Sequence, residues 1–489
     1  MVLQRGVPLT SLWGFAAPGA SVSTTLGCGG CPPVPDATVG ADGVWRAQVP
    51  PLLPTAAPFN VTFATAGAPA ITLTDVLVGD VLLCSGQSNM QLSISMALNA
   101  SAEIAALPAY GATVRIMYTA GAPSAVPLVD LPVPAMAWQR LGLGAGAASW
   151  GGFSATCWYT GRSLWRALGA GAVPVGLVES SVGGTAVRNW VPAEGLAACP
   201  QPYNSPAPYG TAPYLHSALF NGMIAPFSTG PTQFRAVVWD QAESDSFPQT
   251  PVGYYGCQTA AMLPAWRAAL GAPALPWVFV HLQPYPAAGL EDLRSFQLVA
   301  LSHPATGVAS AVDLGDIASP LGAVHFRAKQ AIGDRLATAL RFLGGDAAAA
   351  AVYPPPAFLA QAAYASSGGA PVVDVTFFRP GAARGAPALP LTLQAPPQPC
   401  PSGLNCTAFE ILGSDGGAYA ADAALAAGGL ALRITAPALP AGVYAVGSAY
   451  AWSQWPLAVL FGPGGLPVLP WRQALTLGGP PGPPPPEAG

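Results

Sequence analysis

The chain of 489 residues carries 22 acidic and 18 basic side chains, and its formal net charge is −4. It contains no basic cluster, which argues against a nucleic-acid partner. Its length predicts two or three domains rather than one core, and its 57 glycines and 56 prolines predict many turns.

Residues 1 to 75 predict a small β-rich domain. The segments "TSLWGFAAPGASVSTTL" and "FNVTFATAGAPAITL" alternate apolar with small polar residues and are punctuated by Gly and Pro. The opening "MVLQRGVPLTSLWGF" lacks the basic start and apolar core of a signal peptide.

Between residues 76 and 345, short apolar runs alternate with helical segments. Buried parallel strands are predicted for "DVLVGDVLLCSG", "VPVGLVESS", "FRAVVWDQ", "LPWVFVHLQ" and "GVASAVDLGD". Helices are predicted for "CWYTGRSLWRALGA", "CQTAAMLPAWRAALG" and "FRAKQAIGDRLATALRFL". This alternation favours an α/β fold with a parallel sheet.

After about residue 345 the chain returns to strands and turns. Residues 346–476 predict a β-sandwich-like domain, and the Pro-rich residues 477–489 predict a disordered tail. A long uncharged stretch, residues 434–471, contains six prolines, so we expect no membrane span.

The eight cysteines and three glycosylation sequons favour a secretory setting, in a lysosomal or extracellular glycoprotein; the sequons are at Asn60, Asn99 and Asn405. Cys28 and Cys31 form a lone C-x-x-C without the second pair of a zinc site, so a loop or a local bridge is favoured over a metal. Cys400 and Cys406 could pair, and the connectivity stays open.

The main chemical motif is "GDVLLCSGQSNMQLS". Ser88 follows a predicted strand through Gly86 and precedes a segment that could begin a helix. This arrangement presents a hydroxyl at the carboxyl edge of a parallel sheet, close to backbone N–H groups and a helix dipole. A serine in such a turn is more often a structural cap than a nucleophile, so further motifs must decide.

The whole string resembles the nucleophile block of the sialate O-acetylesterases, which are SGNH hydrolases that cleave acetyl esters from sugars. Other segments resemble the same family in the same order: "MVLQRG", "LWGFAAPGASV", "FSATCWYTGRSLW", "VPVGLVESSVGGTAVRNW", "VVWDQAESDS", "DLGD", "VHFRAKQAIGDRLA", "YAWSQWP" and "LPVLPWR". The resemblance covers residues 1 to about 472. It implies a three-layer α/β/α SGNH-hydrolase domain over residues 76–345, flanked by the two β-domains.

The resemblance also implies a serine mechanism that needs neither metal nor organic cofactor. It makes Ser88 the nucleophile and His325 the general base. It offers the backbone N–H groups of Ser88 and of Gly183 or Gly184, with the Gln241 side-chain amide, as oxyanion-hole donors.

Other polar and aromatic residues lie near these blocks. His281 lies inside an apolar strand and is expected to be structural, whereas a substrate-side role for His216 stays open. Glu243 is expected to support Gln241 or the helix entry. Trp190 and Trp239 fit a core role better than a sugar platform.

The residue two positions before the base departs from the pattern. Many SGNH enzymes have an acid there, but this chain has Ala323. The orienting acid must then be Asp313 or Asp316, or the enzyme works as a Ser–His dyad. Asp316 is preferred because it lies in the connection between a strand and His325.

The sequence therefore predicts an enzyme that hydrolyses O-acetyl esters on a carbohydrate through an acetyl-enzyme. Sialic acid is the family's named substrate, but acetyl-xylan and other acetylated glycans present similar esters. The alternative, a carbohydrate-binding protein that has lost catalysis, is favoured by Ala323 and by Phe326 and Ala242, which replace the family's Pro and Gly. A lipase or peptidase of the α/β-hydrolase type ranks low because Ser88 lacks the G-x-S-x-G context.

Overall fold

The computed structural model describes the chain except for residues 7–9, 120, 133–135, 142–150, 200–214, 231–232, 247–252, 366–370, 380–389, 405 and 476–489. The chain forms two compact units. Unit 1 comprises Met1–Val280, Phe296–Ala309 and Arg327–Gly344, and unit 2 comprises His281–Ser295, Ser310–Phe326 and Gly345–Gly489. The expected tail, residues 477–489, lies outside the described residues.

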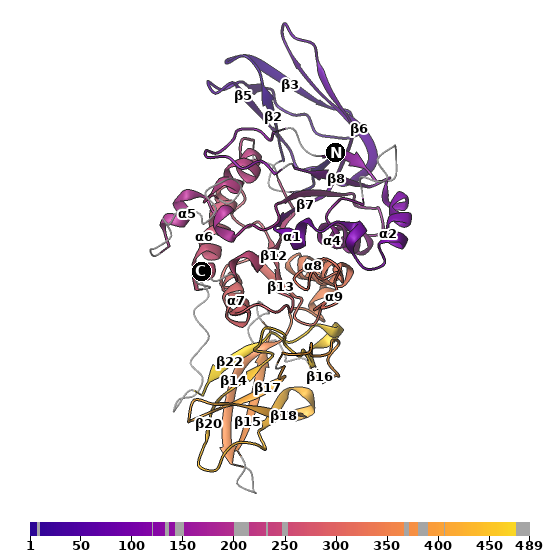
Figure 1. Ribbon diagram of the computed structural model, residues 1–489. Coiled ribbons are helices and arrows are strands. Elements are labelled where there is room, and N and C mark those ends of the chain that lie inside the picture. The colour runs from indigo at the N-terminus through magenta and orange to yellow at the C-terminus, as the bar shows by residue number, and fades with distance from the viewer. Residues whose placement is uncertain are drawn as a thin grey trace. The chain divides into compact units, whose positions relative to one another are not determined.

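Unit 1 is built on a mostly parallel sheet (Figure 1). Its strand order is β13 (Thr306–Ser310), β12 (Trp277–His281), β11 (Ala236–Asp240), β7 (Ile71–Gly86), β10 (Val175–Ser181), β8 (Val114–Tyr118) and β9 (Met136–Arg140). The pairs β12–β11, β11–β7, β7–β10 and β10–β8 are parallel, and β9 is antiparallel to β8. The five apolar runs of the sequence are thus strands, and the α/β prediction is confirmed.

The helices expected between the strands are also present. They are α4 (Ala155–Ala167), α6 (Gly253–Ala269) and α8 (Lys329–Leu343), and shorter helices are α1 (Ser88–Gln91), α2 (Ala100–Ala106), α5 (Ala193–Ala197), α7 (Leu290–Gln297) and α9 (Ala347–Ala350). Ser154 caps α4 by accepting a hydrogen bond from the Cys157 N–H. The α4 and α8 helices pack closely at Gly333 of α8, where any side chain would clash with the backbone at Tyr159. The absence of a Cβ on Gly333 allows this close approach.

The N-terminal strands belong to unit 1. They are β1 (Val2–Gln4), β2 (Thr10–Phe15), β3 (Ser21–Leu26), β4 (Ala37–Thr38), β5 (Val44–Val49) and β6 (Thr55–Thr65). Strand β7 pairs with β6 along its first part and with β10 and β11 along its second (Figure 1). One 16-residue strand therefore runs from the N-terminal β-region to Gly86, two residues before Ser88.

Unit 2 contains a seven-stranded antiparallel sheet. Its order is β14 (Ala357–Ala365), β15 (Pro371–Phe378), β19 (Ala431–Thr435), β18 (Ala418–Ala426), β17 (Phe409–Gly413), β20 (Ala445–Tyr450) and β22 (Trp471–Ala474). A second pair joins β16 (Thr392–Leu393) to β21 (Leu460–Phe461). The hydrophobic core of unit 2 includes the buried residues Ile411, Ile434 and Tyr450.

All eight cysteines form disulfides: Cys28–Cys31, Cys84–Cys157, Cys199–Cys257 and Cys400–Cys406. The first is the local bridge that the sequence favoured over a metal, and the last is the suggested loop closure. The bridge Cys84–Cys157 ties the end of β7, four residues before Ser88, to α4.

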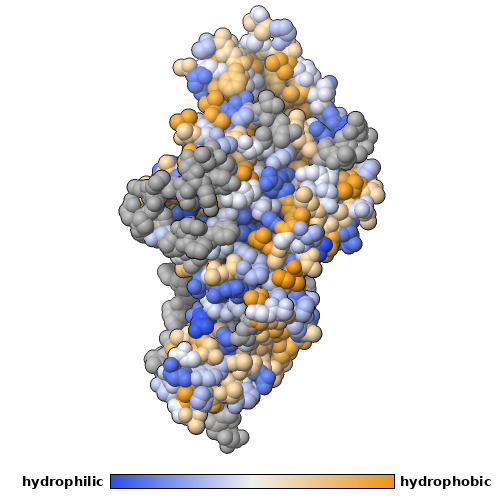
Figure 2. All heavy atoms as spheres, in the orientation of Figure 1, coloured by the Kyte–Doolittle hydropathy of each residue, from blue (hydrophilic) through white to orange (hydrophobic). Residues whose placement is uncertain are grey.

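In the view of Figure 2, hydrophobic and hydrophilic residues are interspersed over the described part of the surface. Among the described residues, none of the helices is both long and apolar enough to cross a bilayer.

Candidate active site

Ser88 is the first residue of α1 and directly follows the turn at the carboxyl end of β7. Gly86 makes this turn possible. Its φ is +139°, and a Cβ there would lie 2.1 Å from the Asp240 carbonyl oxygen. Only glycine fits such a close approach to β11. The Gln87 N–H then donates to the same oxygen at 3.0 Å, which fixes the backbone just before the serine.

Gln87 is a site residue that the sequence reasoning did not single out. Its side chain is buried, and its Oε1 accepts hydrogen bonds from Gln241 Nε2 and from the Ser244 N–H, both at 3.1 Å. Its place between Gly86 and Ser88 in the motif was the available signal.

Gln241 follows β11 and is completely buried. Its Nε2 lies 2.6 Å from Asp245 Oδ2, 3.0 Å from Thr185 O and 3.1 Å from Gln87 Oε1. Burial raises the pKa of Asp245 to about 6, opposed by hydrogen bonds from Gln241 and the Val187 N–H. The two amide protons of Gln241 therefore already have protein acceptors.

Ala242, where the family has glycine, adopts φ +139° and is fully buried. This backbone conformation is rare for a residue with a Cβ. The departure noted in the sequence is therefore a strained turn immediately after Gln241.

Gly183 follows β10 and lies against Ser88. A Cβ on it would be 3.4 Å from the Ser88 Cβ. Its N–H donates to Gln91 Oε1 at 2.9 Å, and the next residue, Gly184, has φ +74°. In the described part of the chain, the Gly184 N–H makes no hydrogen bond. Ser88, the Gly183–Gly184 turn and Gln241 thus follow three adjacent parallel strands at one sheet edge.

A fully buried charged cluster contacts Asn89, the residue after Ser88. Lys329 Nζ donates to Asn89 Oδ1 at 2.9 Å and lies 3.7 Å from Asp240 Oδ2. Asn89 Nδ2 donates to Glu243 Oε1. Burial lowers the pKa of Lys329 to about 8 and raises that of Asp240, while their mutual attraction opposes both shifts.

This cluster was also missed from the sequence, although one signal was available. Lys329 is the only lysine in the chain, all other basic side chains of the 18 being arginine. A sole lysine that is fully buried beside the residue after Ser88 points to a specific structural task.

His325 belongs to unit 2, in the loop that ends before α8. Its Nδ1 lies 2.8 Å from the Leu321 carbonyl oxygen, and its own carbonyl accepts a hydrogen bond from Ser319 Oγ at 2.7 Å. If Nδ1 carries the proton and donates it to Leu321 O, Nε2 keeps the lone pair that a general base needs.

The same loop holds Asp316, whose carbonyl oxygen accepts the Ser319 N–H at 3.1 Å. Gln283 Nε2 supports the loop by donating to the Val324 carbonyl at 2.8 Å. A Cβ on Gly315 would meet the Trp455 ring at 2.9 Å, so the closing motif "YAWSQWP" packs against this loop.

The remaining candidates have plain structural surroundings. His281 is buried, with Nδ1 3.3 Å from Ser310 Oγ, and burial lowers its pKa to about 3. Trp190 and Trp239 are buried in edge-to-face contact, 5.8 Å between ring centroids, so the core interpretation is confirmed. Burial, with nearby Arg188, lowers the pKa of half-buried His216.

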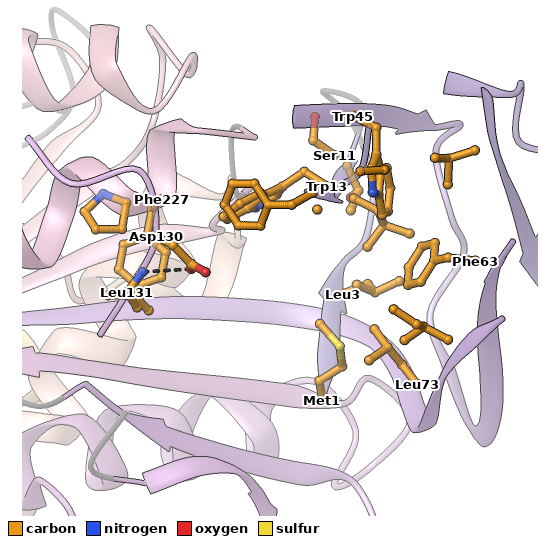
Figure 3. Close-up of a pocket in the computed structure, with 18 of the residues that line it drawn as sticks. Met1, Leu3, Ser11, Trp13, Trp45, Phe63, Leu73, Asp130, Leu131 and Phe227 are labelled. Atoms are coloured by element: carbon orange, nitrogen blue, oxygen red, sulfur yellow. Dashed lines mark hydrogen bonds between the residues drawn. The ribbon is translucent and has the colours of Figure 1, made fainter. Parts of the chain in front are cut away.

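A cavity of about 760 Å³ lies in unit 1 away from these residues (Figure 3). Trp13, Trp45, Phe63 and Leu73 are among the residues that line it. None of the residues around Ser88 described above belongs to its lining, so it is distinct from the candidate active site.

Comparison with known proteins identifies the class. A family model described as "Carbohydrate esterase, sialic acid-specific acetylesterase" matches residues 135–341. The sialate O-acetylesterases of Pongo abelii and Homo sapiens are each 33% identical over 373 residues, which cover 70% of this chain and 69% of theirs. The Mus musculus enzyme is 32% identical over 389 residues, covering 69% of this chain and 70% of its own.

A solved structure agrees with this result. The carbohydrate acetylesterase from Xanthomonas citri superposes with a TM-score of 0.76 at 28% identity, covering 96% of this chain and 97% of its own. The fold and these similarities define a carbohydrate esterase. Within that class, the chain belongs to the sialate O-acetylesterase family, and the family predicted from the motifs is confirmed.

Proposed function

We propose that this protein hydrolyses O-acetyl esters on a carbohydrate, with Ser88 as nucleophile and His325 as general base. Family membership supports a hydrolase of carboxylic esters. The observation that carries the residue assignment is the position of Ser88: it begins α1 at the carboxyl edge of the sheet, between the turns that hold Gly183 and Gln241.

In the proposed reaction, Ser88 Oγ attacks the acetyl carbonyl while His325 Nε2 takes its proton. The tetrahedral intermediate collapses, and the sugar hydroxyl leaves with that proton. Water, activated by His325, then attacks the acetyl-enzyme and releases acetate. Every step uses side chains of this protein and water.

Chain connectivity supports the pairing of Ser88 with His325. Lys329 contacts Asn89, the neighbour of Ser88, and is only four residues beyond His325. Four residues span at most about 14 Å even when fully extended. The Cα atom of His325 therefore lies within about 14 Å of the Cα atom of Lys329.

For the orienting group of His325, Leu321 O is the contact that holds Nδ1. We propose that Asp316 adds electrostatic support to the imidazolium formed during attack. A dyad assisted only by the backbone carbonyl is the competing arrangement, and it predicts little loss of activity on Asp316→Asn.

For the oxyanion, we propose donors from the Gly183–Gly184 turn, the Ser88 N–H and Gln241. The Gly183 N–H already donates to Gln91, and the Gln241 amide already donates to Asp245. To bind these two donors, the oxyanion must share each hydrogen bond with the present acceptor or take its place. The Gly184 N–H carries no such competing bond within the described part of the chain.

The test is acetate release from O-acetylated sialic acid and from acetylated xylan, with Ser88→Ala beside the wild type. We expect kcat to fall by at least about 10³-fold and labelling by a fluorophosphonate probe to be lost. Ser302→Ala, which changes an exposed serine of the same unit, is the matched control. The glycan from which the wild type releases acetate faster would identify the preferred substrate. A folded protein that binds glycans but neither releases acetate nor labels would support the binding-protein alternative.

We further propose a secretory, lysosomal or extracellular location, because four disulfides persist in oxidising compartments. Asn60 and Asn99 are exposed and open to glycosylation, whereas Asn405 lies outside the described residues. Expression in eukaryotic secretory cells followed by glycosidase treatment tests both points, since an unchanged mass would exclude glycans.

The finer architecture is likewise a proposal. We propose that residues 76–345 form a three-layer SGNH-hydrolase domain, with β-rich regions at 1–75 and 346–476 beside it. Limited proteolysis with mass spectrometry should cut near residue 345 and leave the second part of β7 intact, because β7 is buried from Val76 to Gly86.

A further inference from the structure

The side chain of Gln91 bridges two groups at the carboxyl edge of the sheet. Its Oε1 accepts the Gly183 N–H at 2.9 Å, and its Nε2 lies 2.9 Å from the Tyr118 hydroxyl. The orientation of the amide follows from chemistry, because a backbone N–H can only donate and so must face the oxygen. Nε2 therefore donates to the hydroxyl oxygen of Tyr118.

These groups surround the nucleophile. Gln91 is three residues after Ser88 on α1, which places both on one side of a single helical turn. Gly183 lies against Ser88, as its 3.4 Å Cβ distance shows. Tyr118 ends β8, where it pairs with Glu179 of β10, so it reaches the same sheet edge.

The Tyr118 hydroxyl has one proton left to donate. A phenol can accept and donate at once, and here the acceptor role is taken by Gln91. In the part of the chain that the structure describes, no group accepts the Tyr118 proton. The side chain is half-buried, and burial raises the pKa of Tyr118, so the hydroxyl stays protonated at neutral pH.

We propose that Tyr118 is a substrate-positioning residue whose hydroxyl donates a hydrogen bond to an oxygen of the acetylated sugar, and that Gln91 holds it in place. This inference rests on the proposed function, in which Ser88 is the nucleophile. A sugar presents ring, hydroxyl or carboxylate oxygens as acceptors, whereas a simple aryl acetate has none beyond its ester. Tyr118 should therefore select for the sugar rather than act on the acetyl group.

The experiment compares Tyr118→Phe with the wild type on an O-acetylated sugar and on phenyl acetate. We expect the ratio of kcat/KM for the sugar ester to that for the aryl ester to fall about 2- to 12-fold, mainly through KM, as the loss of one neutral hydrogen bond requires. Gln91→Met should lower kcat on both esters, because it also releases the Gly183 turn beside Ser88.

Tyr444→Phe, which removes an exposed hydroxyl in unit 2, is the matched control and should leave the ratio unchanged. An unchanged ratio in Tyr118→Phe, or equal losses on both esters in a folded variant, would overturn the inference. Ser88→Ala is measured alongside. If Ser88→Ala keeps its activity, both the proposed function and this inference are wrong. If Ser88→Ala is inactive but Tyr118→Phe has the wild-type ratio of kcat/KM values, only this inference is wrong.

Discussion

Replacing Glu179 by glutamine should change how stability depends on pH. Glu179 lies on β10 and is completely buried, where Oε2 accepts the Ser154 N–H at 2.8 Å and Oε1 accepts Ser181 Oγ at 2.9 Å. Burial raises the pKa of Glu179 from 4.5 to about 8, and these two hydrogen bonds only partly oppose the shift. The folded protein therefore holds this carboxyl protonated at neutral pH.

The sign follows from linkage. Because its pKa is raised in the folded state, Glu179 makes its full contribution to the free energy of unfolding below pH 4.5. This contribution declines as the pH rises and is lost by about pH 8. A difference of about 3.5 pKa units corresponds to roughly 5 kcal/mol across this window. Glutamine keeps the same shape and cannot ionise, and its amide can still accept from the Ser154 N–H.

The assay is urea unfolding of wild type and Glu179→Gln from pH 5 to pH 9, followed by tryptophan fluorescence. Many of the buried tryptophans, such as Trp158 and Trp266, lie in unit 1. Subtracting the two curves cancels the other titrating groups, so the relative stability of the variant should rise by several kcal/mol between pH 5 and pH 8. Glu194→Gln, at an exposed carboxyl of α5, controls for the lost charge. Parallel curves for wild type and Glu179→Gln would refute the reasoning.

Three further substitutions test the site. Gly86→Ala should destabilise by about 2–5 kcal/mol and abolish probe labelling, because its Cβ would lie 2.1 Å from the Asp240 oxygen; normal urea unfolding would contradict this. Lys329→Met should cost about 3–5 kcal/mol by leaving Asp240 uncompensated and Asn89 without its donor, and an unchanged thermal midpoint would exclude a buried ion pair. Asp316→Asn should lower kcat with little change in KM, and full activity would favour the backbone-assisted dyad.

Much of the local structure was predictable from the sequence. Apolar runs of strand length separated by helical segments identified β7, β10 and β11, and their order along the chain indicated a parallel sheet. The string around Ser88 predicted a strand, a glycine turn and a helix, which the structure contains. These features depend on neighbouring residues, so the sequence determines them directly.

The long-range partners were decided only by the tertiary structure. Lys329 and Asn89 are 240 residues apart, and Gln91 meets Gly183 across 92 residues. No periodicity or spacing encodes such contacts, since they arise when parallel strands bring distant turns to one edge. For the same reason the ionisation of Glu179 could not be read from its neighbours in the chain: its pKa depends on burial, which only the packed sheet creates.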